Sequence, residues 1–510
     1  MNENFIEDEA GGESLLSTAA RVAETVENLD GYSELASLIA TRYAESGLLD
    51  VAVDLAETVA DPYAREQLLA GIAAECVEFG EDTYADDLLQ MIEDPGLYSM
   101  AREQMAVKYA EADTFDKALE IAREIDDSGQ TLSRIALIYA DNSLFAQALE
   151  MARSIEDPLL KATALTELAA RNLRQGMRDE SAELLLEATR ATKGIDLVED
   201  RVHILVEIAS LYQENGQEED AFEILSRASQ LAVEFDDASD RSVAQDSRKD
   251  QMLATVAAGF ARLQRYHQAE PLLEKLEDPF QFSEATANVA LEYHKAGQSD
   301  QALNLLTEAL EVAKGEEVYG EHGLTMRENS LAKLADAYST INHYEEALQI
   351  AESISSLNLR HSALKEVAKT GVRAGNHDIV FRVAELAWEP YAKVLYHLEI
   401  TDALVESGQT ELADRTLSLA FETAETLERA FEKSLALMEI ALRYAQREQT
   451  AKAAELLFQA LKTAALIGDE YHKARALIAL DDRYRKVELE PGEREQRVLQ
   501  EIDAQIEGQN

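Results

Sequence analysis

The sequence predicts an all-α fold, a right-handed superhelical solenoid of about twelve helix-turn-helix repeats with capping helices. Three observations lead to this prediction. Only 7 prolines and 22 glycines occur among 510 residues. Ala, Leu and Glu, which lose little freedom in a helix, are abundant. Finally, one spacing pattern recurs along a chain that is too long for a single compact core.

The recurring pattern starts from an anchor residue, as in "IASLYQENGQEEDAFEILSRA" (208–228). From Ala209, Tyr follows at +3, Gly at +7, a small residue at +12 and apolar residues at +16 and +19. The anchor and its +3 neighbour share one helix face. Gly or Asn at +7 supplies a left-handed turn, and the small +12 residue lets a second helix approach closely. Each unit is therefore a predicted helical hairpin, and twelve anchors share the frame: Ala40, Ala73, Ala106, Ala136, Ala169, Ala209, Ala257, Ala290, Ala335, Ala368, Thr401 and Ala441.

The spacing between anchors and the residues at unit ends predict further details. Several units end with an acidic residue followed by Pro, where the acid would cap the next helix and Pro would occupy its first position. These pairs are Asp61-Pro62, Asp94-Pro95, Asp157-Pro158, Asp278-Pro279 and Glu389-Pro390. Longer units predict extended second helices after Gly176 and Gly408. The two longest units predict loops at 234–250 and 314–328.

Both ends of the chain are interpreted as caps. Residues 1–13 are expected to be a disordered acidic segment, and residues 14–30 an N-terminal capping half-repeat, because they match the second helix of the next unit at an offset of 33. The repeat array then covers 31–469, and 470–510 hold C-terminal capping helices and a tail. Asp481 takes the anchor position there, which suggests a wet outer face. The final helix carries one apolar stripe, made of Val498, Leu499, Ile502 and Ile506.

The frame resembles the tetratricopeptide repeat (TPR) family over roughly residues 14–485, with Ala where Gly is more usual at the anchor. Five units depart from Tyr at +3, with Cys76, Asn172, Phe260, Gly371 and Leu404. The resemblance implies that the first helices line a concave groove at positions −6, −3, +1 and +4. Some members clamp a carboxylate there with Lys or Arg at −3 and Asn at +1. Here Asn is absent at +1 and Lys365 is the sole basic residue at −3, so such a clamp is not expected.

The groove positions are small and apolar, most clearly near the C-terminal end. The candidate partner-binding groove consists of Leu395, Leu398, Val405, Leu435, Met438 and Leu442. Exposed apolar patches of this kind mark contacts. Three occupants stay open: the chain's own last helix, an amphipathic helix or extended segment of another protein, and a second copy of the chain.

Charge, hydropathy and cysteine content exclude several kinds of partner, location and cross-link. Lys and Arg total 47 against 99 acidic residues, a formal net charge of −52, which repels phosphate backbones and predicts no nucleic-acid partner. No apolar stretch reaches the roughly 20 residues that span a bilayer, and the acidic start lacks a leader pattern, so a cytoplasmic location without membrane insertion is expected. A single cysteine, Cys76, excludes an internal disulfide. The acidity itself fits either solubility in a salty cytoplasm or steering of a basic partner.

No catalytic constellation stands out. The nine histidines are scattered, and neither metal-binding pairs nor a glycine-rich phosphate loop occurs. We therefore expect no catalytic residues, no metal and no cofactor. The predicted function is a non-catalytic scaffold or adaptor that binds a protein or peptide, basic or amphipathic-helical, in the concave groove, as a monomer or weak dimer. The alternative is a peptide-gated regulator or sensor subunit of a separately encoded effector.

Overall fold

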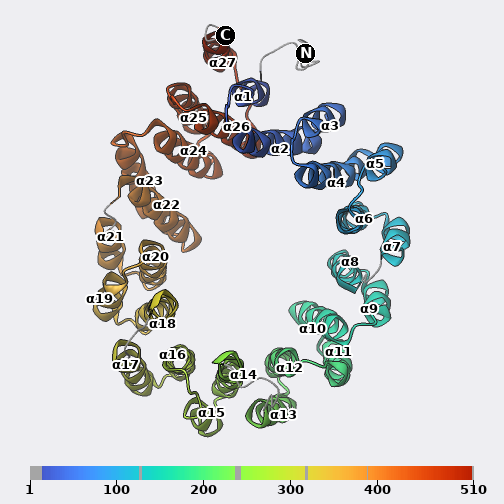
Figure 1. Cartoon of the computed structure of the whole chain (residues 1–510). Coiled ribbons are helices and arrows are strands. Elements are labelled where there is room, and N and C mark those ends of the chain that lie inside the picture. Colours follow the sequence, from blue (N-terminus) through green and yellow to red (C-terminus); the bar gives the residue numbers. More distant parts are fainter. Residues whose placement is uncertain (1–13, 126–128, 236–242, 316–319, 387–388, 508–510) are drawn as a thin grey trace. The chain divides into compact units, whose positions relative to one another are not determined.

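The computed structural model describes residues 14–125, 129–235, 243–315, 320–386 and 389–507, so the segment 1–13 lies outside the described residues. Within these ranges every regular element is a helix (Figure 1). The prediction of an all-α array is confirmed. The chain divides into two compact units, unit 1 with residues 1–126 and 384–510, and unit 2 with residues 127–383.

Unit 1 contains the helices of both ends of the chain. Its N-terminal helices are α1 (Leu15–Ala23), α2 (Leu29–Glu45), α3 (Leu49–Glu57), α4 (Pro62–Phe79), α5 (Asp82–Leu89), α6 (Pro95–Glu111) and α7 (Phe115–Arg123). Its C-terminal helices are α22 (Pro390–Glu406), α23 (Thr410–Glu425), α24 (Ala430–Gln446), α25 (Thr450–Ala465), α26 (Glu470–Lys486) and α27 (Glu493–Glu507). In this unit each even-numbered helix from α2 to α6, and α22 and α24, is the first helix of a hairpin, and the odd-numbered helix that follows it is the second.

Unit 2 continues the same alternation. It holds α8 (Gly129–Asp141), α9 (Phe145–Ser154), α10 (Pro158–Arg174), α11 (Arg178–Ala191), the short 3-10 helix η1 (Thr192–Gly194), α12 (Val198–Glu214), α13 (Glu218–Glu234), α14 (Val243–Arg262), α15 (Tyr266–Leu273), α16 (Pro279–Lys295), α17 (Ser299–Gly315), α18 (Gly320–Thr340), α19 (Tyr344–Ser353), α20 (Leu357–Arg373) and most of α21 (His377–Leu386). The extended second helices expected after Gly176 and Gly408 are confirmed, because α11 has 14 residues and α23 has 16, against 8 in α5.

The turn inside each hairpin is left-handed at +7, as predicted. Among the described residues, all positive φ angles lie seven positions after an anchor, if Asp481 is counted as a thirteenth anchor. Seven of these residues are glycines, at 47, 80, 176, 216, 297, 375 and 408. The other six are Asp113, Ser143, Gln264, Asn342, Glu448 and Glu488. The turn geometry is therefore imposed by the packing of the hairpin even where the residue type opposes it.

The helix caps follow the sequence with one exception. The side chains of Asp61, Asp94, Asp157 and Asp278 each accept a hydrogen bond from a backbone amide in the first turn of the next helix. Glu389 precedes Pro390 in the same way, but its side chain makes no capping hydrogen bond. Glu has one methylene more than Asp and is not among the favoured capping residues.

The two predicted loops are shorter than expected. Helix α14 begins at Val243 and α18 at Gly320, so much of 234–250 and 314–328 is helical, and 236–242 and 316–319 lie outside the described residues. Part of the reason is that Asp250 and Glu328, seven positions before their anchors, are buried in these helices. Asp250 accepts hydrogen bonds from the amides of residues 277 and 278 at 2.9 and 2.7 Å. Glu328 does the same for residues 355 and 356 at 2.8 and 3.1 Å.

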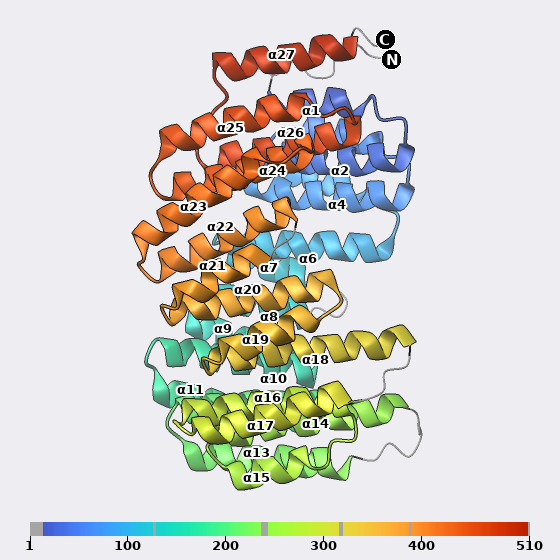
Figure 2. The ribbon, with the colours of Figure 1, turned by 90° about the vertical axis from the view of Figure 1, so that its left-hand side faces the viewer.

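The two ends of the chain pack together within unit 1. Helix α1 lies against α26, α2 and α27 (Figures 1 and 2). It thereby occupies the place of a second helix beside α26. The wet outer face expected for Asp481 was wrong: its side chain is mostly buried, and burial, only partly opposed by Arg485, raises the pKa of its carboxyl.

We expect Gln264→Gly to stabilise the chain by about 1 kcal/mol, because Gln264 is held at a φ of 57° that glycine adopts without a Cβ clash. Asn342→Gly should gain less, since Asn tolerates this conformation better. Chemical denaturation of both variants measures the difference. Equal gains, or a loss for Gln264→Gly, would contradict this account of the turn.

Candidate binding surface on the first helices

The first helices of unit 1 present a row of accessible side chains at −6, −2, +2 and +5 from each anchor. In α4 the row is Gln67, Gly71, Glu75 and Glu78, and in α24 it is Leu435, Glu439, Arg443 and Gln446. All eight residues are exposed or half-buried. The spacing of about four residues places each row on a single helix face. We call the rows on α2, α4, α6, α22, α24 and α26 the first-helix surface.

The predicted groove residues lie on this surface, beside it and in the core. Leu395 and Leu435 belong to the surface at −6, the first 38% exposed and the second half-buried. Val405 at +4, 47% exposed, and half-buried Leu442 at +1 lie beside it. Two others, Leu398 and Met438, are only 1% exposed, so their prediction as groove-lining residues was wrong. Both stand at −3, a position that is buried on α4, α22, α24 and α26 but half-buried at Ser37 on α2 and Glu103 on α6. The accessible position is −2, about 100° further round the helix.

The last helix does not cover these residues. Helix α27 packs against α25 and α1, as Figure 2 also shows. Its stripe residues Leu499 and Ile502 are fully buried in that contact. Of the three occupants that the sequence left open for the apolar groove on α22 and α24, the chain's own last helix is therefore excluded.

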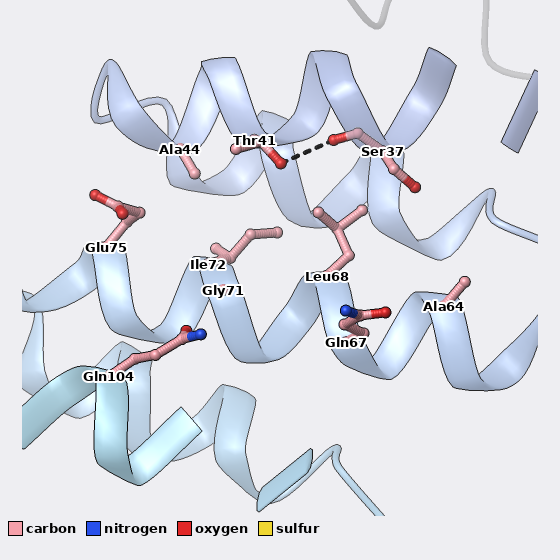
Figure 3. Close-up of a pocket in the computed structure, with 10 residues that line it drawn as sticks. All are labelled: Ser37, Thr41, Ala44, Ala64, Gln67, Leu68, Gly71, Ile72, Glu75 and Gln104. Carbon is pink, nitrogen blue, oxygen red and sulfur yellow. Dashed lines mark hydrogen bonds between the residues drawn. The ribbon is translucent and has the colours of Figure 1, made fainter. Parts of the chain in front are cut away.

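An open pocket of about 390 Å³ lies on the first-helix surface between α2, α4 and α6 (Figure 3). Buried Leu68 and Ile72 form its apolar floor, and their side chains point from α4 towards α2. Gly71 leaves the α4 backbone open, because a Cβ added there would meet no atom within 4 Å. The remaining lining residues are Ser37, Thr41, Ala44, Ala64, Gln67, Glu75 and Gln104.

The polar groups of the pocket are suited to hydrogen bonding. The Thr41 hydroxyl donates to the carbonyl of Ser37 at 2.9 Å, which leaves its oxygen free to accept. Gln67 and Gln104 each add an amide that can donate and accept. Glu75, at the far edge, accepts a hydrogen bond from the Lys108 ammonium at 3.0 Å. Donors and acceptors of both kinds around an apolar floor match an extended peptide, whose backbone offers both.

Ion pairs connect neighbouring first helices at the C-terminal side of unit 1. Arg443 on α24 pairs with Asp402 on α22 at 2.9 Å, and Arg483 on α26 pairs with Glu439 on α24 at 2.5 Å. Burial alone would raise the pKa of the Glu439 carboxyl. Its hydrogen bonds and charge attraction with Arg483 and Arg443 outweigh burial and lower that pKa. These two acidic side chains are therefore neutralised by neighbouring Arg side chains.

One histidine lies buried beneath this surface. His397 on α22 is 3% exposed. Burial, followed by the nearby charge of Lys393, lowers the pKa of its imidazole to about 4. His397 is therefore neutral at physiological pH and acts as a packing group.

Three further features concern metal ions, the single thiol and membranes. No cluster of three or more His, Cys, Asp or Glu side chains there could hold a metal ion. Cys76 on α4 is buried, and burial raises the pKa of its thiol to about 11. No helix among the described residues is both long and apolar enough to cross a bilayer.

No family model matches the sequence, and no curated protein matches it either. Among solved structures the chain is similar to Ton1535 from Thermococcus onnurineus NA1, with 19% identity, 74% of this chain and 98% of that chain covered, and a TM-score of 0.26. It is also similar to the apo quorum sensor NprR from B. thuringiensis, with 11% identity, 70% and 97% covered, and a TM-score of 0.26. A third is the signal transduction ATPase PH0952 from Pyrococcus horikoshii, which has a tetratricopeptide repeat sensor, with 13% identity, 80% and 72% covered, and a TM-score of 0.25.

The class of the protein follows from its own hairpins. Repeated first and second helices, left-handed turns at +7 and a small residue at +12 define a TPR-like helical repeat array.

We expect His397 to make stability depend on pH. Its pKa is about 4 in the folded chain and about 6.5 when unfolded. Between these values the unfolded state binds more protons, so the free energy of unfolding falls as pH drops from about 6.5 towards 4. The loss should be on the order of 2 kcal/mol at pH 5 relative to pH 7. In urea denaturation at both pH values, the change in unfolding free energy between pH 7 and pH 5 should differ between wild type and His397→Gln by this amount. His203→Gln, which removes an exposed histidine, is the control variant.

Two glycines inside helices should respond to Ala with opposite signs. Gly71→Ala should stabilise the chain by roughly 0.5–1 kcal/mol, because the added methyl meets no atom and Ala favours the helix. Gly259→Ala should destabilise it, because the Cβ would lie 2.7 Å from Cδ2 of Leu225. Thermal unfolding of both variants provides the comparison, and changes of the same sign would argue against the packing described.

Proposed function

We propose that this protein is a non-catalytic adaptor that holds an extended segment of a partner protein on the first-helix surface of unit 1. The observation that supports it most directly is the pocket at Gly71, where three first helices combine an apolar floor with free hydrogen-bonding capacity. Exposed Leu395 and Val405 on α22 offer a second, apolar contact within the same unit.

The chemistry of the partner follows from the pocket. A space of about 390 Å³ suits one or two side chains of a partner rather than a helix. The amides of Gln67 and Gln104 would pair with the partner's backbone, and Leu68 and Ile72 would contact an apolar side chain. Since the nearby cations Lys108 and Arg42 are already paired, a largely uncharged segment suits the site better than a basic one.

Gly71→Tyr tests the proposal. The larger side chain should fill the pocket without disturbing the fold, because nothing stands near the position of its Cβ. Peptides selected from a displayed random library on the wild-type protein should bind Gly71→Tyr at least tenfold more weakly. Gly315→Tyr in α17 of unit 2, also without close neighbours, is the matched control and should bind as wild type does. Peptides that bind both variants equally would sink the proposed site.

A further inference from the structure

The contact between α1 and α26 is a hairpin without a connecting turn. In every other hairpin of unit 1, a short turn joins the two helices, such as the three residues between α2 and α3. Helix α26 also ends in a left-handed residue, Glu488, at +7. However, the next helix, α27, packs on α25 and α1 and leaves the second-helix position to α1. The second helix of this last hairpin therefore comes from the opposite end of the chain.

The packing of α1 reproduces that of a second helix in detail. Ala19 and Ala23 are fully buried. They correspond to Ala52 and Ala56 of α3, at an offset of 33, and those residues are equally buried. Leu15 and Leu16 at the start of α1 are buried as well. Helix α1 thus completes a hairpin with α26 and, in the same way as other second helices, also contacts the following first helix, α2.

Polar contacts with the neighbouring helices flank the packing of α1 against α26, which we call the joint. They lie on both of its sides. Arg21 on α1 donates from Nε to Oδ1 of Asp503 on α27 at 2.8 Å and from Nη2 to Oδ2 at 2.5 Å, and Asp503 is only 9% exposed. Such two-point pairs between guanidinium and carboxylate are strong and directional. On the other side, Arg42 on α2 pairs with Asp482 on α26 at 2.9 Å. The Tyr471 hydroxyl donates to Glu34 on α2 at 2.7 Å.

Charge also favours this pairing of ends. Helix α26 carries five Lys or Arg residues against three acidic ones, in a chain with a net charge of −52. Helix α2 carries three acidic residues and one Arg. The ends therefore attract one another where most of the chain repels itself.

We infer that α1 is a latch: it holds the two ends of unit 1 together, and it can leave α26 while the hairpins that have a connecting turn stay folded. The physical reason is the missing turn. Short turns keep the two helices of the other hairpins at high effective concentration, whereas α1 and α26 are separated by more than 400 residues of chain. The contact is therefore held by non-covalent interactions alone: its own interface and the α1–α27 and α2–α26 contacts beside it. This inference does not depend on the proposed function.

The test uses the full chain with one label on each side of the joint, at Glu57→Cys on α3 and Gln446→Cys on α24, both exposed. The native Cys76 is buried and should not react. Energy transfer between the labels reports whether the ends are together. Ala19→Asp places a charge in the α1–α26 contact and should raise the population with separated ends at least tenfold, while circular dichroism keeps its helical signal. Ala52→Asp makes the same change in a hairpin that has its turn, and should leave the ends together.

A charge-exchange pair of variants distinguishes separation of the ends from general misfolding. Arg21→Asp should separate the ends, and adding Asp503→Arg to it should bring them back together. The inference that α1 is a latch is wrong if Ala19→Asp and Ala52→Asp change the energy transfer between the labels equally. It is also wrong if the ends stay together in Arg21→Asp, or if separation occurs only with loss of the helical signal.

Discussion

The structure depends on one close contact, between the anchor of each first helix and the residue at +12 of its second helix. In the hairpin of α10 and α11 this contact is direct, because the Ser181 hydroxyl donates to the carbonyl of Ala169 at 3.0 Å. A larger residue at +12 requires a smaller residue opposite it on the first helix. In α21 the +12 residue is Val380, and the +3 residue facing it is Gly371, whose Cβ would lie 3.3 Å from Cγ2 of Val380. The Gly that departs from Tyr at +3 is therefore a packing solution, since interiors tolerate little extra volume.

Local sequence predicted most of the fold because each hairpin is determined by residues within one repeat. The frame located the left-handed turn even at Gln264 and Glu448, which on their own disfavour that conformation. It also located the Asp caps, since a cap and its helix are neighbours in the chain. It did not reveal that Asp250 and Glu328 bind the segment that leads into the next repeat, because that contact joins residues about 27 positions apart.

The candidate surface was harder to predict, for a geometric reason. One residue along a helix is a rotation of about 100°, so an error of one position exchanges a core residue for a surface residue. That is the difference between Met438, which is buried, and Glu439, which is accessible. The angle at which first helices pack decides between them, and no single repeat encodes that angle. The joint between α1 and α26 was missed for a related reason: the sequence showed that α1 has the pattern of a second helix, but the partner lies at the other end of the chain.

The first-helix surface crosses the contact between the two ends of unit 1, and this links binding to closure. Arg42 on α2 reaches Asp482 on α26 across the joint, and Arg483 on α26 reaches Glu439 on α24. The surface runs from α24 across α26 to α2, so separation of the two ends would interrupt it. A segment bound across α26 and α2 would favour the closed state by the same free energy with which closure favours binding. A segment confined to the pocket at Gly71 lies on α2, α4 and α6 alone, so its affinity should not change when the latch opens. The position of a bound segment thus decides whether this chain acts as a passive adaptor or as a gated one.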